Sequence, residues 1–362
     1  MMDRRRADTG VRASQVTPVP ERPADVEQLW TLAQRLSVDT LPVWLEPAAA
    51  GAYRRVAAAP PPDQWSALES AGLIVDASGV YIADPTQQAV FSVGVCEVTS
   101  PLEPAPPLHP ALTRDDVTDI VASFVADPFL LRAADGWHMF FEVWNWRENK
   151  GEIGHATSRG GLDWCYDRIV LAEEFHLSYP YVVEHAGERW MVPEGFQAGA
   201  VRLYRADPFP WRWTLETTLL EAEYVVDASP FCWSGRWWLY AETSPQHDTL
   251  RIYSAEELRG PWREHPASPV VSGDPSRSRP AGRPLVDGER VVRFAQDCSR
   301  EYGKLVRAFE VTELTPTRYV ERELPGPTLA GSGQGWNARG MHHLDAQQLP
   351  DGRWLAAVDG WR

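Results

Sequence analysis

The stretch VADPFLLRAADGWHMFFE, residues 125–142, predicts a β-hairpin in which two apolar runs flank a turn at Ala133–Gly136. An acid stands at each open end, Asp127 where the first strand begins and Glu142 where the second strand ends. Antiparallel pairing brings these two points together. The hairpin therefore places two carboxylates side by side at one rim.

Hairpins of this form recur along the chain at intervals of about 50 residues, each followed by further short strands. A period of that size with four strands per unit is typical of a β-propeller. Five inner hairpins predict five blades. The hairpins are DPFLLRAADGWHMFFE (127–142), SYPYVVEHAGERWMVPE (178–194), DASPFCWSGRWWLYAE (227–242), RPLVDGERVVRFAQD (283–297) and HHLDAQQLPDGRWLAAVD (342–359).

The last hairpin ends at Asp359, almost at the end of the sequence, so its blade needs outer strands from elsewhere. The segment FSVGVCEVTSPLEPAPPLHPALT has the strand–turn–strand pattern of an outer pair. We therefore expect residues 89–112 to complete blade five and remove an open sheet edge. The predicted fold is all-β, a five-bladed β-propeller over residues 87–362.

The N-terminal part has a different character. Residues 1–22 are polar and contain prolines, which predicts disorder. Residues 23–86 predict a small, mostly helical extension of winged outline, with helices over 24–36 and near 47–58 and a hairpin turning at Asp76–Gly79. This extension lacks a basic face, and it could serve as an arm for homodimerisation.

Composition limits the partners. The 362 residues include 35 basic and 50 acidic side chains, a net charge of −15, which argues against nucleic acid and anionic membrane surfaces. No run of about 18 apolar residues is present, so no membrane insertion is expected. The four cysteines show no CxxC spacing, and no apolar segment follows the first basic residues. These features predict a cytoplasmic protein.

Tryptophans recur with the repeat. Trp164, Trp213 and Trp262 occupy one strand position in successive blades, which favours packing between blades over ligand stacking. Trp144 and Trp146 follow Glu142 in a loop, so they are better candidates for the rim of a site.

In a propeller, the residues that open the first strand and close the second converge on one mouth of the central channel. We therefore expect a polar pocket there. Its candidate residues are Asp127 and Glu142 in blade one, Tyr179 and Glu194 in blade two, Asp227 or Ser229 with Glu242 in blade three, Arg279, Arg283, Gln296 and Asp297 in blade four, and His342 or His343 with Asp359 in blade five.

Carboxylates facing each other across a pocket are the equipment of glycosidic bond cleavage, in which one protonates the leaving oxygen and the other activates water or attacks the sugar. Arg283 and Gln296 could bind hydroxyls or an acidic group. The neighbouring His342 and His343 cannot both face the channel from one strand, because side chains alternate. We predict no metal ligand and no cofactor.

Several segments carry a family resemblance: LTRDDVTDIVASFVADPF (112–129), HLSYPYV (176–182), RPAGRP (279–284), RFAQD (293–297), GMHHLD (340–345) and DGRWLAAVDG (351–360). They resemble the domain at the N-terminus of plant glucosamine inositolphosphorylceramide transferases, which also occurs in bacterial proteins. The resemblance covers roughly residues 89–362. That family is similar in fold to five-bladed propeller glycosidases of the arabinanase, xylosidase and invertase kind.

The resemblance implies roles for some positions. Asp127 matches the glycosidase Asp that acts as base or nucleophile at the start of blade one. The second glycosidase Asp is replaced here by Tyr179 or Ser178, and Asp227 stands near the position of the general acid Glu. The likeness also leaves an axial cation near His343 as an alternative to having no cofactor.

These observations predict a sugar-processing enzyme, glycoside hydrolase-like or glycosyl-transferring, acting on a small glycoside or nucleotide-sugar-like substrate. Asp127 would be base or nucleophile and Glu194 or Asp227 the acid. The predicted binding residues are Glu142, Tyr179, Glu242, Arg279, Arg283, Gln296, Asp297 and His343. Two alternatives remain, a non-catalytic carbohydrate-binding or scaffold propeller, and another group transfer or elimination on a sugar-like substrate.

Overall fold

The computed structural model describes residues 90–362 and four short strands nearer the N-terminus. Its two compact units are Met1–Ala89 and Val90–Arg362. In the first unit, β1 (Trp44–Pro47) pairs with β2 (Tyr53–Val56), and β3 (Ile74–Asp76) pairs with β4 (Gly79–Tyr81), both antiparallel.

The hairpin predicted to turn at residues 76–79 is confirmed, because Asp76 pairs with Gly79. The helix predicted near 47–58 is wrong where the structure describes it, since Tyr53–Val56 is a strand. Aromatic and β-branched residues at the two ends of that segment favour extended backbone. The disorder predicted for 1–22 and the helix over 24–36 lie outside the described residues, and the dimerisation arm stays a prediction.

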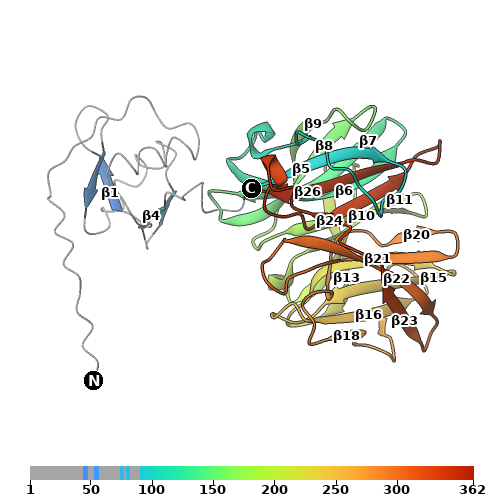
Figure 1. Ribbon diagram of the computed structural model, residues 1–362. Helices are drawn as coiled ribbons and strands as arrows, with labels where there is room; N and C mark the ends of the chain where they lie inside the picture. The colour runs from blue at the N-terminus through green and yellow to red at the C-terminus, as the bar shows by residue number, and fades with distance from the viewer. Residues whose placement is uncertain (1–43, 48–52, 57–73, 77–78, 82–89) are drawn as a thin grey trace, which may run out of the picture. The chain divides into compact units, whose positions relative to one another are not determined.

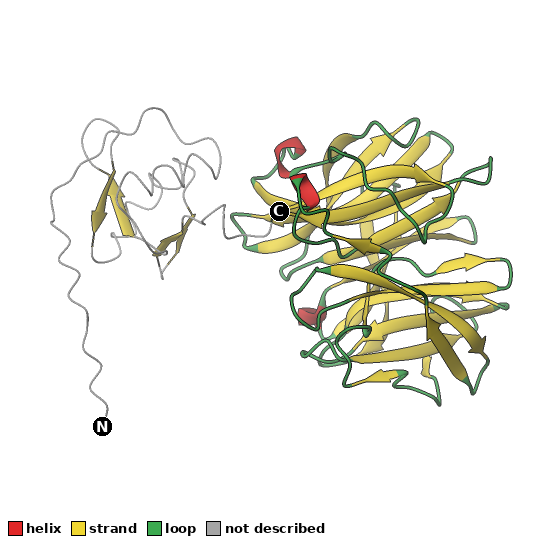
Figure 2. Cartoon of the chain, viewed as in Figure 1, coloured by secondary structure: helices red, strands yellow, loops and turns green. Residues whose placement is uncertain are grey.

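The second unit is a five-bladed β-propeller, built almost wholly of strands and connecting loops (Figures 1 and 2). Blade one contains β6 (Ala122–Ala133), β7 (Gly136–Asn145), β8 (Lys150–Ser158) and β9 (Cys165–Leu171). Blade two contains β10 (Ser178–His185), β11 (Glu188–Glu194), β12 (Ala200–Ala206) and β13 (Trp213–Glu221). Blade three contains β14 (Val226–Trp233), β15 (Arg236–Glu242), β16 (Thr249–Ala255), β17 (Arg263–Glu264) and β18 (Val271–Ser272).

Blade four contains β19 (Arg279–Pro280), β20 (Leu285–Asp287), β21 (Arg290–Gln296), β22 (Leu305–Leu314), β23 (Tyr319–Glu323) and β24 (Leu329–Ala330). Blade five contains β25 (Leu344–Gln348), β26 (Trp354–Trp361) and β5 (Phe91–Val98). Single 3-10 turns within the described residues cover Arg114–Asp116, Phe196–Ala198 and Gly335–Asn337.

Blade five is closed by chain from the other end of the propeller, as predicted. Strand β5 pairs with β26 along its whole length, from Phe91 opposite Trp361 to Val98 opposite Trp354. An isolated bridge between Val93 and Leu112 continues the sheet outward. The ladder gives β26 a hydrogen-bonding partner along an edge that would otherwise be open.

The first strands of blades one to three begin with the same irregularity. Their registers slip between Ala126 and Phe129, between Ser178 and Tyr181, and between Val226 and Ser229. The residue inside each slip has a left-handed φ, 52° at Asp127, 45° at Tyr179 and 53° at Asp227. A bulge of this kind re-aims the side chains around it. A proline follows directly at 128 and 180, inside the slip, where no ladder N–H is needed, whereas Asp227 is followed by Ala228.

The repeated tryptophans pack as predicted. Trp213 is buried, and its ring meets that of Phe140 in blade one at 5.3 Å between centroids. Trp164 and Trp262 are partly buried against the apolar core. Each indole N–H donates to a nearby backbone carbonyl, which satisfies its one polar group. Among the helices that the structure describes, none has the length and apolar character to cross a membrane.

Candidate active site

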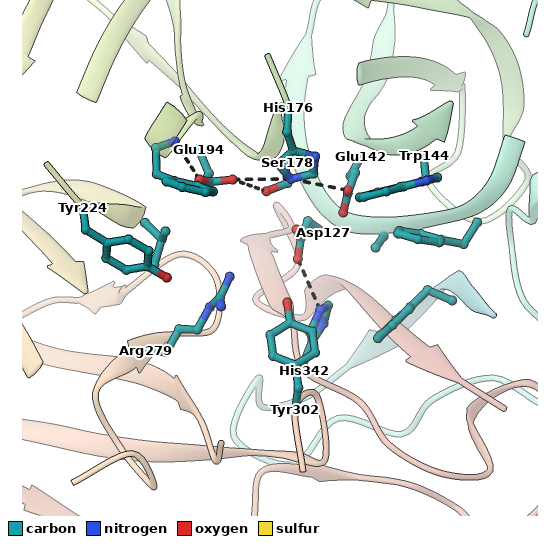
Figure 3. A pocket seen from close by; sticks show the side chains of 15 residues that line it. Asp127, Glu142, Trp144, His176, Ser178, Glu194, Tyr224, Arg279, Tyr302 and His342 are labelled. Carbon is teal, nitrogen blue, oxygen red and sulfur yellow. Dashed lines mark hydrogen bonds and ion pairs between the residues drawn. The ribbon is translucent and has the colours of Figure 1, made fainter. Parts of the chain in front are cut away.

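A pocket of about 250 Å³ opens where the inner strands begin (Figure 3). Blades one and two supply most of its wall through β6, β7, β10 and β11, and blades four and five supply the opposite side. Its lining consists of three acids, two histidines, one arginine, aromatic rings and small residues: Asp127, Glu142, Glu194, His176, His342, Arg279, Phe91, Phe124, Trp144, Phe196, Tyr224, Tyr302, Ala126, Ser178 and Val226.

Asp127 lies near the propeller axis and is 5% exposed. Its Oδ2 accepts the backbone N–H of Tyr179 at 3.3 Å, and its own N–H donates to Asp359 at 3.0 Å. Burial raises the pKa of Asp127 to about 7, although His342 opposes this rise. A carboxyl group with this pKa can exchange a proton near neutral pH.

The two histidines of blade five both lie near Asp127, but they differ in their partners and in their pKa. His342 Nδ1 contacts Asp359 Oδ2 at 2.7 Å, and its Nε2 lies 3.9 Å from Asp127 Oδ1. Burial lowers the pKa of His342, but the charge and hydrogen bond of Asp359 and the charge of Asp127 together outweigh burial, so the pKa is raised. The imidazolium form of His342 is therefore favoured.

His343 is fully buried, and its Nε2 lies 3.0 Å from the carbonyl oxygen of Pro128, to which it donates. Its Nδ1 then has no hydrogen, has no hydrogen-bond partner among the described residues, and lies 3.5 Å from Asp127 Oδ1. Burial lowers the pKa of His343 to about 3. The protonated form of Asp127 is the one that can donate to this nitrogen.

Glu194 ends the second strand of blade two, whereas Glu142, predicted to end the second strand of blade one, lies within β7, three residues before Asn145. Both acids face the pocket (Figure 3). Burial raises the pKa of Glu142 well above its usual range, and the neighbouring Asp127 charge adds to the rise. Burial also raises the pKa of Glu194, to about 7. Three acids so close in a low-dielectric pocket cannot all be ionised at neutral pH.

The opposite side of the pocket holds its arginine. Arg279 Nε donates to Asp227 Oδ2 at 2.6 Å, and the guanidinium carbon lies 5.0 Å from the ring centre of Tyr302. Asp227 also accepts from Gln296 at 3.2 Å. The charge of Arg279 is thus largely matched by Asp227 before any ligand enters.

The structure brings four of the predicted catalytic and binding residues into the pocket lining, Asp127, Glu142, Glu194 and Arg279. Of the alternative pair in blade five, His342 lines the pocket. The other seven lie behind it. Asp227 and Gln296 hold Arg279, and Tyr179 bonds through its hydroxyl to Ser229 and the backbone of Gly282. Glu242 accepts the N–H of Ser244, Arg283 pairs with Asp345, Asp297 pairs with Arg307, and His343 sits beneath Asp127.

Sequence reasoning missed His176, Tyr224 and Phe124. Each stands three residues before the left-handed residue of its blade, at Tyr179, Asp227 and Asp127 respectively. That shared offset was the signal that could have found them. Of the two tryptophans predicted at the rim, Trp144 lines the pocket, whereas Trp146 is buried elsewhere.

One trio in the described part of the chain has the spacing of metal ligands: Asp127, His342 and Asp359, with donor atoms within 4.8 Å of one another. The oxygens of Asp359 already accept from His342 Nδ1 and from the N–H of Asp127. Because those atoms already satisfy one another, we assign no metal ligand here.

Solved structures with similar architecture include a family 117 glycoside hydrolase, Zg3597, from Zobellia galactanivorans. It is 13% identical, with a TM-score of 0.46 over 75% of this chain and 90% of that one. The α-L-arabinanase of Cellvibrio cellulosa is 17% identical, with a TM-score of 0.47 over 64% of this chain and 86% of that one.

Proteins found by sequence comparison have a higher identity to this chain than these solved structures. Glucosamine inositolphosphorylceramide transferase 1 of Oryza sativa subsp. japonica is 37% identical over 270 residues, and that of Arabidopsis thaliana is 33% identical over 269 residues. Each alignment covers 71% of this chain, which spans about a third of the relatives' length, 36% and 35%. The family model for the N-terminal part of these proteins matches residues 86–361. The chain belongs to the family described as glucosamine inositolphosphorylceramide transferase 1, N-terminal.

Proposed function

We propose that the pocket binds a small sugar-like molecule and breaks or transfers a glycosidic bond with its carboxyl groups. One observation carries this proposal: three buried acids face one pocket of about 250 Å³, in environments that hold protons differently. Acids whose environments separate their pKa values divide into a proton donor and a proton acceptor. The volume suits a ligand the size of one or two sugar rings.

Glu142 is the proposed acid, because its pKa is raised well above the usual range and it keeps its proton at neutral pH. As the bond between the anomeric carbon and the leaving oxygen breaks, Glu142 gives its proton to that oxygen. Asp127 is the proposed base. It takes a proton from water or an acceptor hydroxyl whose oxygen bonds to the anomeric carbon, and the bare Nδ1 of His343 receives a hydrogen bond from the proton that Asp127 has gained.

The aromatic lining supports a sugar as the ligand. Trp144, Tyr224 and Tyr302 offer flat apolar faces beside polar edges, which suits the mixed surface of a sugar ring. The curated relatives are named for glucosamine transfer, and an acid-lined pocket complements an amino group. We therefore infer that amino sugars and their glycosides are the first substrates to test.

The test is a screen of glucosamine, glucose, their glycosides and their nucleotide sugars for thermal stabilisation and turnover. We expect a hit whose turnover falls about 100-fold or more in Asp127→Asn and in Glu142→Gln. Glu242→Gln is the matched control, because this acid closes the equivalent strand of blade three but lies outside the pocket lining.

Equal losses in Glu242→Gln and Glu142→Gln would contradict the assignment. Binding of a sugar without turnover would instead favour a carbohydrate-binding propeller.

A further inference from the structure

His176 stands in the loop between blades one and two, and its ring is held in one orientation. The backbone N–H of Gly151 donates to His176 Nδ1 at 2.8 Å, while the backbone N–H of His176 donates to Gln197 at 2.8 Å. A nitrogen that accepts a hydrogen bond carries no proton in the neutral ring. The single ring proton of neutral His176 is therefore on Nε2.

The Nε2 nitrogen of His176 faces two acids from different blades (Figure 3). His176 Nε2 lies 3.5 Å from Glu194 Oε2 in blade two and 3.8 Å from Glu142 Oε1 in blade one. One donor thus faces two possible acceptors. Whichever carboxyl group is ionised gains the interaction, because a hydrogen bond to the charged form stabilises it.

The two acids differ in their other partners. Glu194 also accepts from the hydroxyl of Ser178 at 2.8 Å and from the N–H of Phe196 at 2.9 Å. Within residues 90–362, no side-chain or backbone donor makes a hydrogen bond to the carboxyl group of Glu142, whose nearest donor is His176 Nε2 at 3.8 Å. The negative charge is therefore better stabilised on Glu194 than on Glu142.

We propose that His176 is a positioning residue that, with its proton fixed on Nε2, holds the negative charge on Glu194 and leaves the transferable proton on Glu142. This inference deepens the proposed function, on which its catalytic meaning rests, because it decides which acid can protonate a leaving group. His176 thus affects the reaction through Glu142 and Glu194 and does not itself react.

Gly151 gives independent support. A Cβ built there would lie 2.2 Å from the carbonyl oxygen of Leu177, 2.7 Å from His176 Cε1 and 2.8 Å from Glu142 Oε1. Only glycine lets this backbone N–H come close enough to fix the ring. The same close approach joins the His176 loop to β8, since Leu177 N–H donates to the Gly151 carbonyl at 3.0 Å.

Burial keeps the His176 ring neutral. Burial lowers the pKa of His176 to about 4, the positive charge of Arg279 lowers it further, and Asp227 opposes that effect. The acids that face it are Glu142 and Glu194, with Asp127 beyond them. His176 therefore acts near neutral pH as a fixed hydrogen-bond donor and does not itself exchange a proton.

The test is a carbon-13 NMR titration of the glutamate carboxyl groups in the full chain, in the wild type, His176→Gln and His176→Asn. The Gln amide nitrogen can occupy the place of Nε2, whereas the shorter Asn amide cannot. We expect the midpoint of Glu194 to rise by about one pH unit in His176→Asn, a tenfold change in proton affinity, and to stay near the wild-type value in His176→Gln. Thermal unfolding of each variant shows that it is folded.

Midpoints that are the same in His176→Asn as in the wild type would overturn the inference, as would equal shifts in both variants. The readout does not depend on turnover. If the midpoints move as expected while no sugar is processed, this assignment stands and the proposed function fails.

Discussion

At the scale of single residues, Asp127 combines an unusual backbone with an unusual environment. Its left-handed φ of 52° belongs to the bulge that turns its side chain toward the axis. Strain of this kind persists only where the surroundings hold it. Here the N–H of Asp127 donates to Asp359, which holds the backbone, and the N–H of Tyr179 donates to the Asp127 carboxyl group.

The first prediction concerns stability. Because the pKa of Asp127 is raised from 3.8 to about 7, the folded protein is destabilised by the ionised form. Asp127→Asn should increase the free energy of unfolding at pH 8 by roughly 1–3 kcal/mol. One pKa unit corresponds to about 1.4 kcal/mol, and the Asn side chain recovers only part of the free energy that burying the charge costs. The Asn amide can also donate to the bare Nδ1 of His343.

The sign follows from linkage. A raised folded pKa stabilises the protein below the unfolded value and loses that contribution as the pH rises through about 7. The gain from Asp127→Asn should therefore shrink from pH 8 toward pH 4, as measured by urea unfolding. Asp287→Asn in an exposed turn is the control. A variant less stable than the wild type at pH 8 would refute the argument.

The second prediction is the pH dependence of turnover. Asp127 must be ionised, so kcat/KM should rise as the pH increases through about 7. Glu142 must stay protonated, and burial raises its pKa well above its usual range, so the rate should fall again at the pH where Glu142 loses its proton. With an aryl glycoside whose leaving group needs no proton, Glu142→Gln should retain activity and lose the basic limb. An unchanged basic limb in that variant would remove Glu142 from the acid role.

At the scale of elements, the bulge repeated in three first strands positions residues of the pocket lining. It places a residue of left-handed φ at the same point of β6, β10 and β14, and the residue three positions earlier then lines the pocket. A second feature of this scale is the closure of blade five, in which β5 pairs along the whole of β26.

The third prediction tests that closure with two truncated chains. A chain that begins at residue 87 keeps β5, whereas one that begins at residue 100 loses it. Losing β5 exposes the edge of β26 and removes the buried side chains Val93 and Val95 from the core. We expect the shorter chain to unfold at least 10 °C earlier, roughly 3 kcal/mol or more, or to aggregate. Equal melting temperatures for the two chains would show that the strand is dispensable.

At the scale of the whole molecule, an ion pair near the axis connects four blades. Arg283 Nε donates to Asp345 Oδ1 at 2.7 Å, and its NH2 donates to the carbonyl of Val182 at 2.8 Å. Asp345 Oδ2 accepts the N–H of Leu130 at 2.6 Å. Blades one, two, four and five therefore meet at one buried pair of charges.

The fourth prediction follows from that burial. Arg283→Met leaves the fully buried Asp345 without its counter-charge, and breaking such a pair costs about 3–5 kcal/mol. Adding Asp345→Asn should restore part of the loss. Arg290→Met, which removes an exposed pair with Glu310, should cost much less, because water screens that pair. Denaturant unfolding compares the three, and equal costs for the two single variants would contradict the axial role.

The sequence was sufficient for the fold because the repeat is local. Alternating hairpins, turn residues and the period of about 50 residues can be seen in the chain itself. The helix predicted near residues 47–58 was wrong because the structure there depends on a pairing partner. Tyr53–Val56 pairs with Trp44–Pro47, and this strand pairing overrode the local helix propensity.

Only part of the candidate site could be predicted from the sequence. Asp127, Glu142, Glu194 and Arg279 were found because the ends of inner strands converge at one mouth. The sequence could not show that Asp227 would turn to Arg279, 52 positions away, or Arg283 to Asp345, 62 positions away. Whether a polar side chain faces the channel or a neighbouring blade depends on contacts across blades.

The sequence by itself thus determined the propeller, its closure by the chain before blade one, and the acids at the mouth, because periodicity and strand ends are local properties. Only the tertiary structure decided which acids share the pocket and which are matched by arginines. It also placed His176 between Glu142 and Glu194. Proton positions depend on burial and on partners from other blades, and these exist only once the blades have packed together.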